Sequence, residues 1–286
     1  MSVICASAND FPTGPPTPPP IPEKVLLLVN QLPELSDREL GPRLDRAMHE
    51  GDDIHHFSRA MTDAICSNRV SLVKELLRCK MPIGPTYIHM AVEAKAKDIL
   101  TIFFNNGWDI NTPMGALNPP VLAYTLEDGE MTTWLLDHGA DPNRRCDIDY
   151  TPLSYAVQMT DMPTIDLLLS RGGDVRIGQL VHWAIYRESN NLELVKFLID
   201  RGAPFHALMY EDHPYSRWMF PFMKETPLHI AVALKRRDVV CYLIQKGASV
   251  ETKDRKGQTV IQSADEDTRR VIMREIQNRN WPAANC

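Results

Sequence analysis

A six-residue phrase recurs along this chain, and each copy leads into the same kind of segment. The clearest copy, TPLHIA, runs from Thr226 to Ala231, and TPLSYA runs from Thr151 to Ala156. An apolar stretch follows each copy, and a glycine stands sixteen residues after the alanine, at Gly247 and at Gly172. A short repeat of this kind is one supersecondary unit that cannot bury its apolar face alone. The chain is therefore predicted to fold as a linear stack of units, each packed against its neighbours.

The small residue that closes the phrase sets the register of seven copies. It falls at Ala64, Ala91, Ala123, Ala156, Ala184, Ala231 and Ala264, in steps of 27, 32, 33, 28, 47 and 33 residues. Helices that stack at a short axial distance leave room only for small side chains on the inner face, which accounts for the alanine. The two short steps predict trimmed hairpin loops, and the long step predicts an insertion at residues 206–223.

The phrase, the apolar helix and the closing glycine together resemble the ankyrin repeat family, whose period is 33 residues. The resemblance covers residues 57–279. It implies an all-α ankyrin-repeat solenoid of about seven helix-turn-helix repeats, with short hairpin fingers and a concave binding surface. It also implies that His89, His182 and His229, at the fourth position of the phrase, hold neighbouring repeats together and do not bind metal.

The segments outside the repeats are predicted from their composition. Residues 1–20 hold six prolines within nine positions, which predicts a disordered proline-rich tail that favours polyproline II. Such a run can be a ligand for an aromatic-lined groove. Residues 21–56 predict a helical cap that covers the apolar face of the first repeat, as the end of a solenoid requires. Residues 280–286 are predicted to be a short C-terminal tail.

The helix predicted from Ile21 to Leu32 also resembles the first helix of an F-box, whose start reads roughly L-P-x-E-[VI]-L. F-box motifs join a substrate receptor to the adaptor subunit of a cullin-type ubiquitin ligase, and an F-box before ankyrin repeats is a known fungal arrangement. Lys24 stands where the motif usually has Glu, and the aromatic- and Leu-rich second half is missing. A solenoid cap is therefore favoured, and a degenerate F-box-like segment at residues 21–50 is the alternative.

Composition disfavours several classes of function. The formal net charge of −6 argues against nucleic acid, because affinity there depends on a basic surface that releases phosphate counterions. The longest apolar run, Val25 to Val29, is too short to span a bilayer. The six cysteines have no metal-like spacing and fit a reducing compartment, so we expect a protein of the cytoplasm, the nucleus or both. No catalytic motif is present, and no enzyme activity, cofactor or metal is predicted.

The insertion at residues 206–223 is the strongest local indication of a binding site. It packs five aromatic residues and three methionines into eighteen positions, and these residue types are enriched in interface hot spots. The predicted partner-binding residues are Tyr210, Tyr215, Arg217, Trp218, Phe220 and Phe222 in the insertion, with Leu126, Tyr150, Gln158 and Met159 in the third and fourth repeats. The alternative is that the insertion folds back and buries its own aromatic rings as a small satellite core.

These observations predict a non-enzymatic adaptor or scaffold. It would bind a protein partner through the concave surface and the insertion at residues 206–223. One alternative is an F-box-like substrate receptor that binds a ubiquitin-ligase adaptor subunit through residues 21–50. A second alternative is a regulator of transcription or of a metabolic pathway that acts through another protein.

Overall fold

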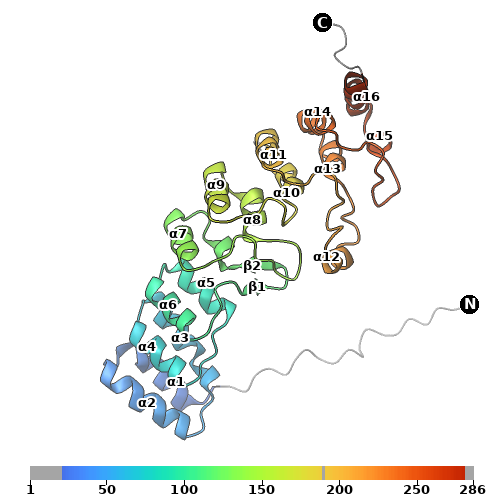
Figure 1. The fold of residues 1–286 in the computed structure, drawn as a ribbon. Coiled ribbons are helices and arrows are strands. Elements are labelled where there is room, and N and C mark those ends of the chain that lie inside the picture. The colour runs from blue at the N-terminus through green and yellow to red at the C-terminus, as the bar shows by residue number, and fades with distance from the viewer. Residues whose placement is uncertain (1–20, 189–190, 281–286) are drawn as a thin grey trace, which may run out of the picture. The chain divides into compact units, whose positions relative to one another are not determined.

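The computed structural model of the protein describes residues 21–188 and 191–280 (Figure 1). The predicted proline-rich tail at residues 1–20 lies outside this part, as do residues 281–286 of the predicted C-terminal tail. The described chain is mostly helical, which confirms the predicted all-α class. It divides into two compact units, residues 1–82 and residues 83–286.

The first unit contains the N-terminal helices and the first repeat. Its elements are α1 (Glu23–Gln31), η1 (Leu32–Glu34), α2 (Asp37–His49), η2 (Ile54–Phe57), α3 (Ser58–Cys66) and α4 (Val70–Arg78). Helix α2 begins at a capping box, in which the Ser36 N–H donates to Glu39 Oε2 at 3.0 Å. The apolar positions repeat with helical spacing, so each helix has one face to bury.

The N-terminal helices pack on the first repeat. Helix α1 lies against α3 through the buried Val25 and Val29, and α2 lies against α4 through the buried Leu40 and Leu44. The guanidinium of Arg69, between α3 and α4, donates to the carbonyls of Leu32 and Pro33 in η1 and to that of Leu35 directly after it, with 2.6 Å to the Leu32 oxygen. Residues 21–49 thus bury the apolar faces of α3 and α4, and the division between the compact units falls after residue 82.

The second unit is a stack of helix pairs. The first helices of the pairs are α5 (Pro85–Glu93), η3 (Val121–Tyr124), α8 (Pro152–Met159), α10 (Leu180–Tyr186), α13 (Pro227–Ala233) and α15 (Val260–Ser263). The second helices are α6 (Lys97–Asn105), α7 (Gly129–Asp137), α9 (Met162–Ser170), α11 (Asn191–Asp200), α14 (Arg237–Gln245) and α16 (Glu266–Asn280). All seven alanines that set the register are buried. Within residues 21–188 and 191–280, no helix has the length and apolar content needed to cross a membrane.

The third repeat differs from the predicted pattern. Its first helix is a single 3-10 turn, η3, because Pro120 disfavours helical dihedral angles at Pro119 before it, and both prolines lie in an extended strand. The finger that precedes this turn, residues 113–120, forms a two-stranded antiparallel sheet of β1 (Pro113–Gly115) and β2 (Asn118–Pro120). Elsewhere the loops follow the step lengths: residues 171–179 join α9 to α10 after a short step, and residues 138–151 join α7 to α8 after a full one.

Asparagine side chains join consecutive repeats along the second unit. Asn111 Nδ2 donates to the Gly139 carbonyl at 3.0 Å, and its Oδ1 accepts the Asp141 N–H at 2.7 Å. Asn143 makes the same pair of bonds one repeat further along, at 2.8 and 2.7 Å. Each asparagine therefore satisfies backbone groups at the end of the next helix pair, where they would otherwise lack partners.

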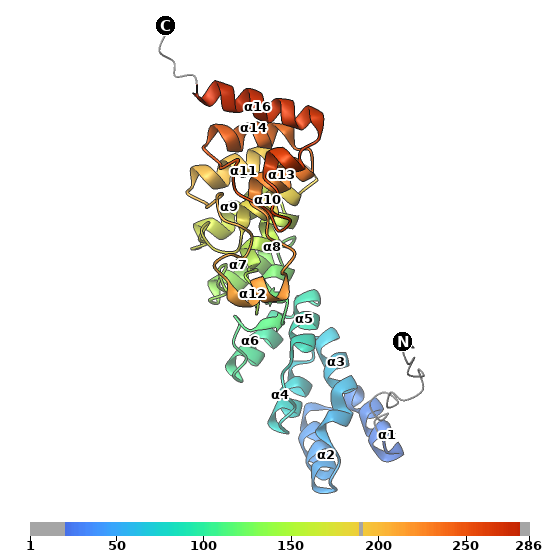
Figure 2. The same cartoon turned by 90° about the vertical axis from the view of Figure 1, so that its right-hand side faces the viewer.

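Ion pairs connect the second helices in the same order. In Figure 2, α7, α9, α11, α14 and α16 follow one another in a row. The pairs that link successive helices are Lys97–Glu130, Asp137–Arg171, Asp166–Arg201, Asp200–Lys246 and Arg237–Asp267. Exposed pairs of this kind each contribute little stability, so the buried apolar faces supply most of the energy of stacking.

The side chain at the fourth position of the phrase forms a hydrogen bond to the next repeat in the fourth and sixth repeats. His229 Nδ1 lies 2.8 Å from Thr226 Oγ1, and its Nε2 lies 3.3 Å from the Gln258 carbonyl of the next repeat. In the fourth repeat Ser154 stands there instead, and its hydroxyl donates to the Gly178 carbonyl at 2.7 Å. The shorter serine reaches the next repeat because the intervening loop is trimmed.

The other two histidines at this position meet the next repeat in other ways. The His182 ring is buried against the main chain of Ala207 and Glu225, although neither ring nitrogen makes a hydrogen bond of good geometry among the described residues. Burial lowers its pKa to about 4, so the ring is neutral at pH 7. The His89 ring packs edge-on against Tyr124 with a centroid distance of 5.3 Å. The three histidines thus contact the next repeat through hydrogen bonds at His229, burial against the main chain at His182 and ring packing at His89.

The contact between Ser154 and Gly178 gives a test of the stack. Gly178 has φ +85°, and a Cβ added there would overlap Ser154 Oγ and lie 3.0 Å from Thr151 Oγ1. Gly178→Ala is expected to cost about 3 kcal/mol in the free energy of unfolding, from left-handed strain and the lost bridge. Gly172→Ala is the control, because Gly172 has φ +97° with nothing within 4 Å of the added Cβ. It should cost about 1 kcal/mol.

Urea denaturation of the two variants measures the difference. Equal losses would mean that the Ser154 bridge contributes nothing to the stack.

Candidate functional site

The insertion at residues 206–223 folds into a short helix held between turns. Helix α12 (Pro214–Met219) begins with proline in its first turn, where the missing amide hydrogen costs nothing. His213 caps it: the Ser216 N–H donates to His213 Nδ1 at 3.2 Å. The insertion is therefore an ordered element with a defined direction.

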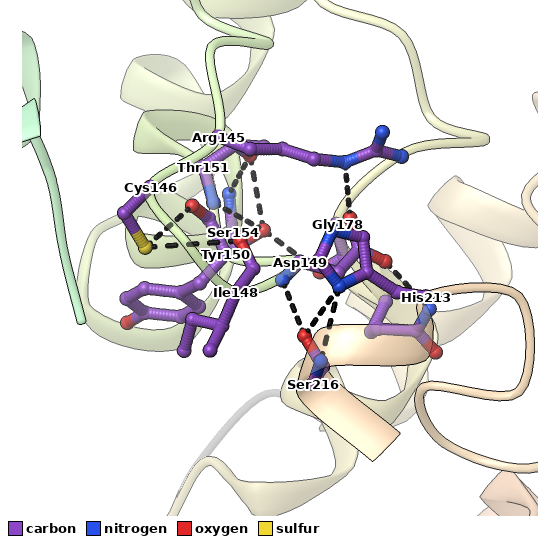
Figure 3. Close-up of polar contacts among 11 residues, drawn as sticks. Arg145, Cys146, Ile148, Asp149, Tyr150, Thr151, Ser154, Gly178, His213 and Ser216 are labelled. Carbon is purple, nitrogen blue, oxygen red and sulfur yellow. Dashed lines mark hydrogen bonds and ion pairs between the residues drawn. The ribbon is translucent and has the colours of Figure 1, made fainter. Parts of the chain in front are cut away.

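Ser216 fastens α12 to the fourth finger, residues 145–150 (Figure 3). Its side chain is fully buried, and its Oγ accepts the main-chain N–H of Asp149 at 2.8 Å. The Ser216 hydroxyl oxygen also lies 2.8 Å from His213 Nδ1, within hydrogen-bond distance. The single hydroxyl thus satisfies one backbone donor of the fourth repeat and one ring nitrogen of the insertion.

The carboxylate of Asp149 extends the same network to the fifth repeat. Its Oδ1 accepts from Arg145 Nε at 2.6 Å, and its Oδ2 accepts from Gln179 Nε2 at 2.7 Å. Gln179 directly precedes α10. Asp149 therefore ties together the fourth finger, the start of the fifth repeat and, through its backbone, the insertion.

Serine, histidine and aspartate meet here without the geometry of a hydrolytic triad. The Asp149 carboxylate is bound to Arg145 and Gln179, and only its main-chain N–H contacts Ser216. Ser216 is fully buried, so its hydroxyl cannot reach a substrate. In residues 21–188 and 191–280 no group of three or more His, Cys, Asp or Glu side chains is placed to hold a metal ion. The cluster is a structural latch.

One side of the insertion forms a small core. Tyr210 is 1% exposed and stacks on the half-buried Phe220 with ring centroids 5.7 Å apart, and Met209 is buried beside it in sequence. Burial also raises the pKa of the Tyr210 phenol. Leu126, in the third repeat, is 4% exposed. Tyr210 and Leu126 are therefore core residues, and the partner contact predicted for them would require their cores to open.

The other side of the insertion faces solvent. Trp218 and Phe222 are 72% and 70% exposed, and Tyr215 and Arg217 are exposed as well. The Tyr215 and Trp218 rings are tilted toward each other with centroids 5.8 Å apart. The guanidinium of Arg255 lies 5.6 Å from the centre of the Phe222 ring. We call Tyr215, Arg217, Trp218 and Phe222 the insertion surface. The self-packed alternative thus describes the side that holds Tyr210, and the exposed side is free to make the partner contact that the sequence predicts.

The predicted contact residues of the fourth repeat differ in exposure. Tyr150 is half-buried, and its hydroxyl donates to Gln158 Oε1 at 2.6 Å. Met159 is exposed at the end of α8. The fourth finger also contacts the third, where the Asp147 N–H donates to the Ala116 carbonyl at 3.0 Å. These residues thus belong to the repeat on which the insertion is anchored.

Sequence reasoning missed the residues that position the insertion surface. Ser216, His213 and Asp149 carry no motif, and the bond between Ser216 and Asp149 joins residues 67 positions apart. The only sign of it in the sequence is the 47-residue step, which locates the insertion but not its anchor.

Ser216→Ala tests the latch. It leaves the buried Asp149 N–H without an acceptor, which is expected to cost about 2 kcal/mol locally. Amide hydrogen exchange at Asp149 should then become roughly thirtyfold faster. Ser170→Ala is the control, since Ser170 is exposed and bonds only to the Leu167 carbonyl of its own helix. Unchanged exchange at Asp149 in the Ser216→Ala protein would show that the hydroxyl does not hold the insertion.

Known proteins resemble this chain in its repeats. A family model described as "Ankyrin repeats (3 copies)" matches residues 88–179 and 178–254. A putative palmitoyltransferase, ZDHHC13, of Danio rerio is 28% identical over 185 residues, which cover 63% of this chain and 27% of the relative. The putative ankyrin repeat protein FPV034 of fowlpox virus is 25% identical over 173 residues, covering 59% and 38%. The chain thus spans well under half the length of these relatives.

The fold has a solved counterpart. The crystal structure of the ankyrin repeat domain of Bcl-3, an IkappaB family member, has a TM-score of 0.52 and 20% sequence identity, and covers 76% of this chain and 97% of its own. At that identity the likeness concerns the fold alone. The matched family model spans more than half of the chain, from residue 88 to residue 254, and with the stacked helix pairs it shows that the protein belongs to the ankyrin repeat family.

Proposed function

We propose that the protein is a non-enzymatic adaptor that binds a protein partner through the insertion surface. Ankyrin repeat domains are typically protein-interaction modules without catalytic chemistry. The partner-facing residues are Tyr215, Arg217, Trp218 and Phe222. Met159 and Gln158 of the fourth repeat extend the proposed contact, with Tyr150 holding the Gln158 amide in place.

The observation that carries this proposal is the exposure of two large rings on an anchored element. Trp218 and Phe222 stay exposed although Tyr210 and Phe220 of the same segment pack together. Tryptophan and arginine are the residues most enriched among binding hot spots. Because Ser216 already orders α12, a partner pays little entropy to engage these rings.

We place this function in the cytoplasm, the nucleus or both. The cysteines at positions 66, 79, 146 and 241 are all free thiols in the described part of the chain, which supports a reducing compartment.

Truncating the two rings tests the proposal. The double variant Trp218→Ala/Phe222→Ala should weaken partner binding by at least about 2 kcal/mol, or roughly thirtyfold in Kd. The thermal midpoint should be nearly unchanged, because both side chains are exposed. Affinity purification with mass spectrometry first identifies the partners of the intact protein, and titration then compares the variant with Met273→Ala, an exposed apolar control on α16.

A variant that keeps every partner at full affinity would contradict the proposal. The identity of the partners also tests the role predicted as an alternative, a regulator of transcription or of a metabolic pathway.

A second candidate is a substrate receptor of a cullin-type ubiquitin ligase, favoured by the outer side of α1. Ile21 beside this helix and Leu26 and Leu27 within it are exposed, although a cap needs only the buried Val25 and Val29. Leu26→Asp/Leu27→Asp should abolish co-purification of the ligase adaptor subunit. Leu117→Asp, at an exposed leucine of the second unit, should leave it intact. Intact protein that never co-purifies with the adaptor subunit would exclude this candidate.

A further inference from the structure

A continuous row of aromatic rings runs along the first helices of the second to fifth repeats. We call it the inner aromatic row; its members, in spatial order, are His89, Tyr124, Tyr155, Tyr150, Trp183 and Tyr186. Neighbouring ring centroids are 5.1 to 6.5 Å apart. The rings come from α5, η3, α8 with the residue shortly before it, and α10, which pack against one another in that order.

The row is neither core nor ordinary surface. Every member is half-buried, so part of each side chain stays accessible to a ligand. Among the ion pairs of residues 21–188 and 191–280, only the contact between His89 and Glu93, at 3.5 Å, involves a member of the row. The nearby cation, Arg187, is bound to the carbonyls of Val157 and Thr160 at 2.7 Å each. An uncharged, apolar ligand therefore suits the row.

The inner aromatic row has tyrosine hydroxyl groups that can donate hydrogen bonds to a ligand. Within the described residues, the hydroxyls of Tyr124, Tyr155 and Tyr186 have no hydrogen-bond partner. The indole nitrogen of Trp183 is itself buried, so Trp183 offers a ligand only the accessible part of its ring. A polyproline II segment has no internal hydrogen bonds, so its carbonyls are free to accept. Its prolines have no N–H and need no acceptor in return. Proline-rich segments are recognised in this way by aromatic-lined grooves.

The spacing of the row also suits polyproline II. Packed helix axes are about 8 to 10 Å apart, and one polyproline II turn of three residues advances about 9 Å. Each turn of such a ligand would therefore lie over one repeat. The row crosses four first helices, a span of about 24 to 30 Å, which corresponds to roughly eight to ten polyproline II residues.

The chain itself contains a segment of this chemistry and length. Residues 12–20 hold six prolines in nine positions, about 28 Å as polyproline II. No charged residue occurs from Phe11 to Pro22. We propose that residues 12–20 of this chain dock in polyproline II conformation on the inner aromatic row.

One end of the row has room for a larger side chain. A hollow of about 300 Å³ lies between α5 and the third finger, lined by His89, Met90, Met114 and Tyr124 among others. It accommodates an apolar side chain that flanks the prolines, such as Phe11. The docked segment would cover the first helices and leave Tyr215, Arg217, Trp218 and Phe222 free. The partner contact proposed for these four residues therefore does not depend on the docking, whereas Gln158 and Met159 lie within reach of both ligands.

Photo-crosslinking in the full-length protein tests the docking. The photoreactive amino acid p-benzoylphenylalanine replaces Tyr155 in the row, with Tyr215 of the insertion surface as the control position and Met159, one turn along α8, as a second position within reach of the row. Mass spectrometry should find adducts with residues 11–22 from Tyr155 and Met159 and none from Tyr215. A mixture of isotopically heavy and light protein separates docking within one chain from docking between two copies, and either result supports the proposal.

A matched variant isolates the prolines. Replacing Pro15, Pro16, Pro18, Pro19 and Pro20 with alanine should abolish these adducts, while circular dichroism of the repeats stays the same. Absence of adducts with residues 11–22, adducts with another protein in their place, or adducts that survive the proline replacements would overturn the proposal.

Discussion

The structure depends on one constraint: a helix pair buries its apolar face only against the next pair. Every other feature of the second unit serves that contact. Alanine on each first helix allows the close approach, and Asn111 and Asn143 satisfy backbone groups across successive junctions. Where the step between repeats is short, a different side chain makes the junction. Ser154 donates to the Gly178 carbonyl at the position where, in the sixth repeat, His229 contacts the Gln258 carbonyl. Stability is therefore local to each junction, and the array tolerates a changed loop as long as the junction is kept.

The insertion obeys the same constraint in another form. Twelve or more extra residues between two repeats would ordinarily be a mobile loop, but here α12 packs on the fourth finger through Ser216 and buries Tyr210. Anchoring and recognition are thereby assigned to different side chains. His213, Ser216 and Tyr210 fix the element, and Trp218 and Phe222 remain available. A rigid aromatic surface on a stacked array is the arrangement expected of a binding module.

The sequence predicted those features that repeat, because stacking imposes the same residue at the same position. The register, the buried alanines and the location of the insertion follow from that rule. The 3-10 turn in the third repeat follows from two adjacent prolines. It was not predicted because Ala123 fits the repeat register, which implies a full helix there. The two sides of the insertion were not separable in advance, since burial of Tyr210 and exposure of Trp218 depend on a bond between residues 67 positions apart. The inner aromatic row was missed because its members occupy different positions of the repeat and only the fold brings them together.

Asp149 has a consequence for how the array would carry a load. Its backbone holds Ser216 of the insertion, and its carboxylate holds Arg145 of its own finger and Gln179 at the start of the fifth repeat. A partner that pulls on α12 would transmit force through this residue to the junction between the fourth and fifth repeats. Tension would thus enter the array near its middle, where the junctions on both sides can share it. A terminal repeat has a neighbour on one side only and would unfold first under the same load.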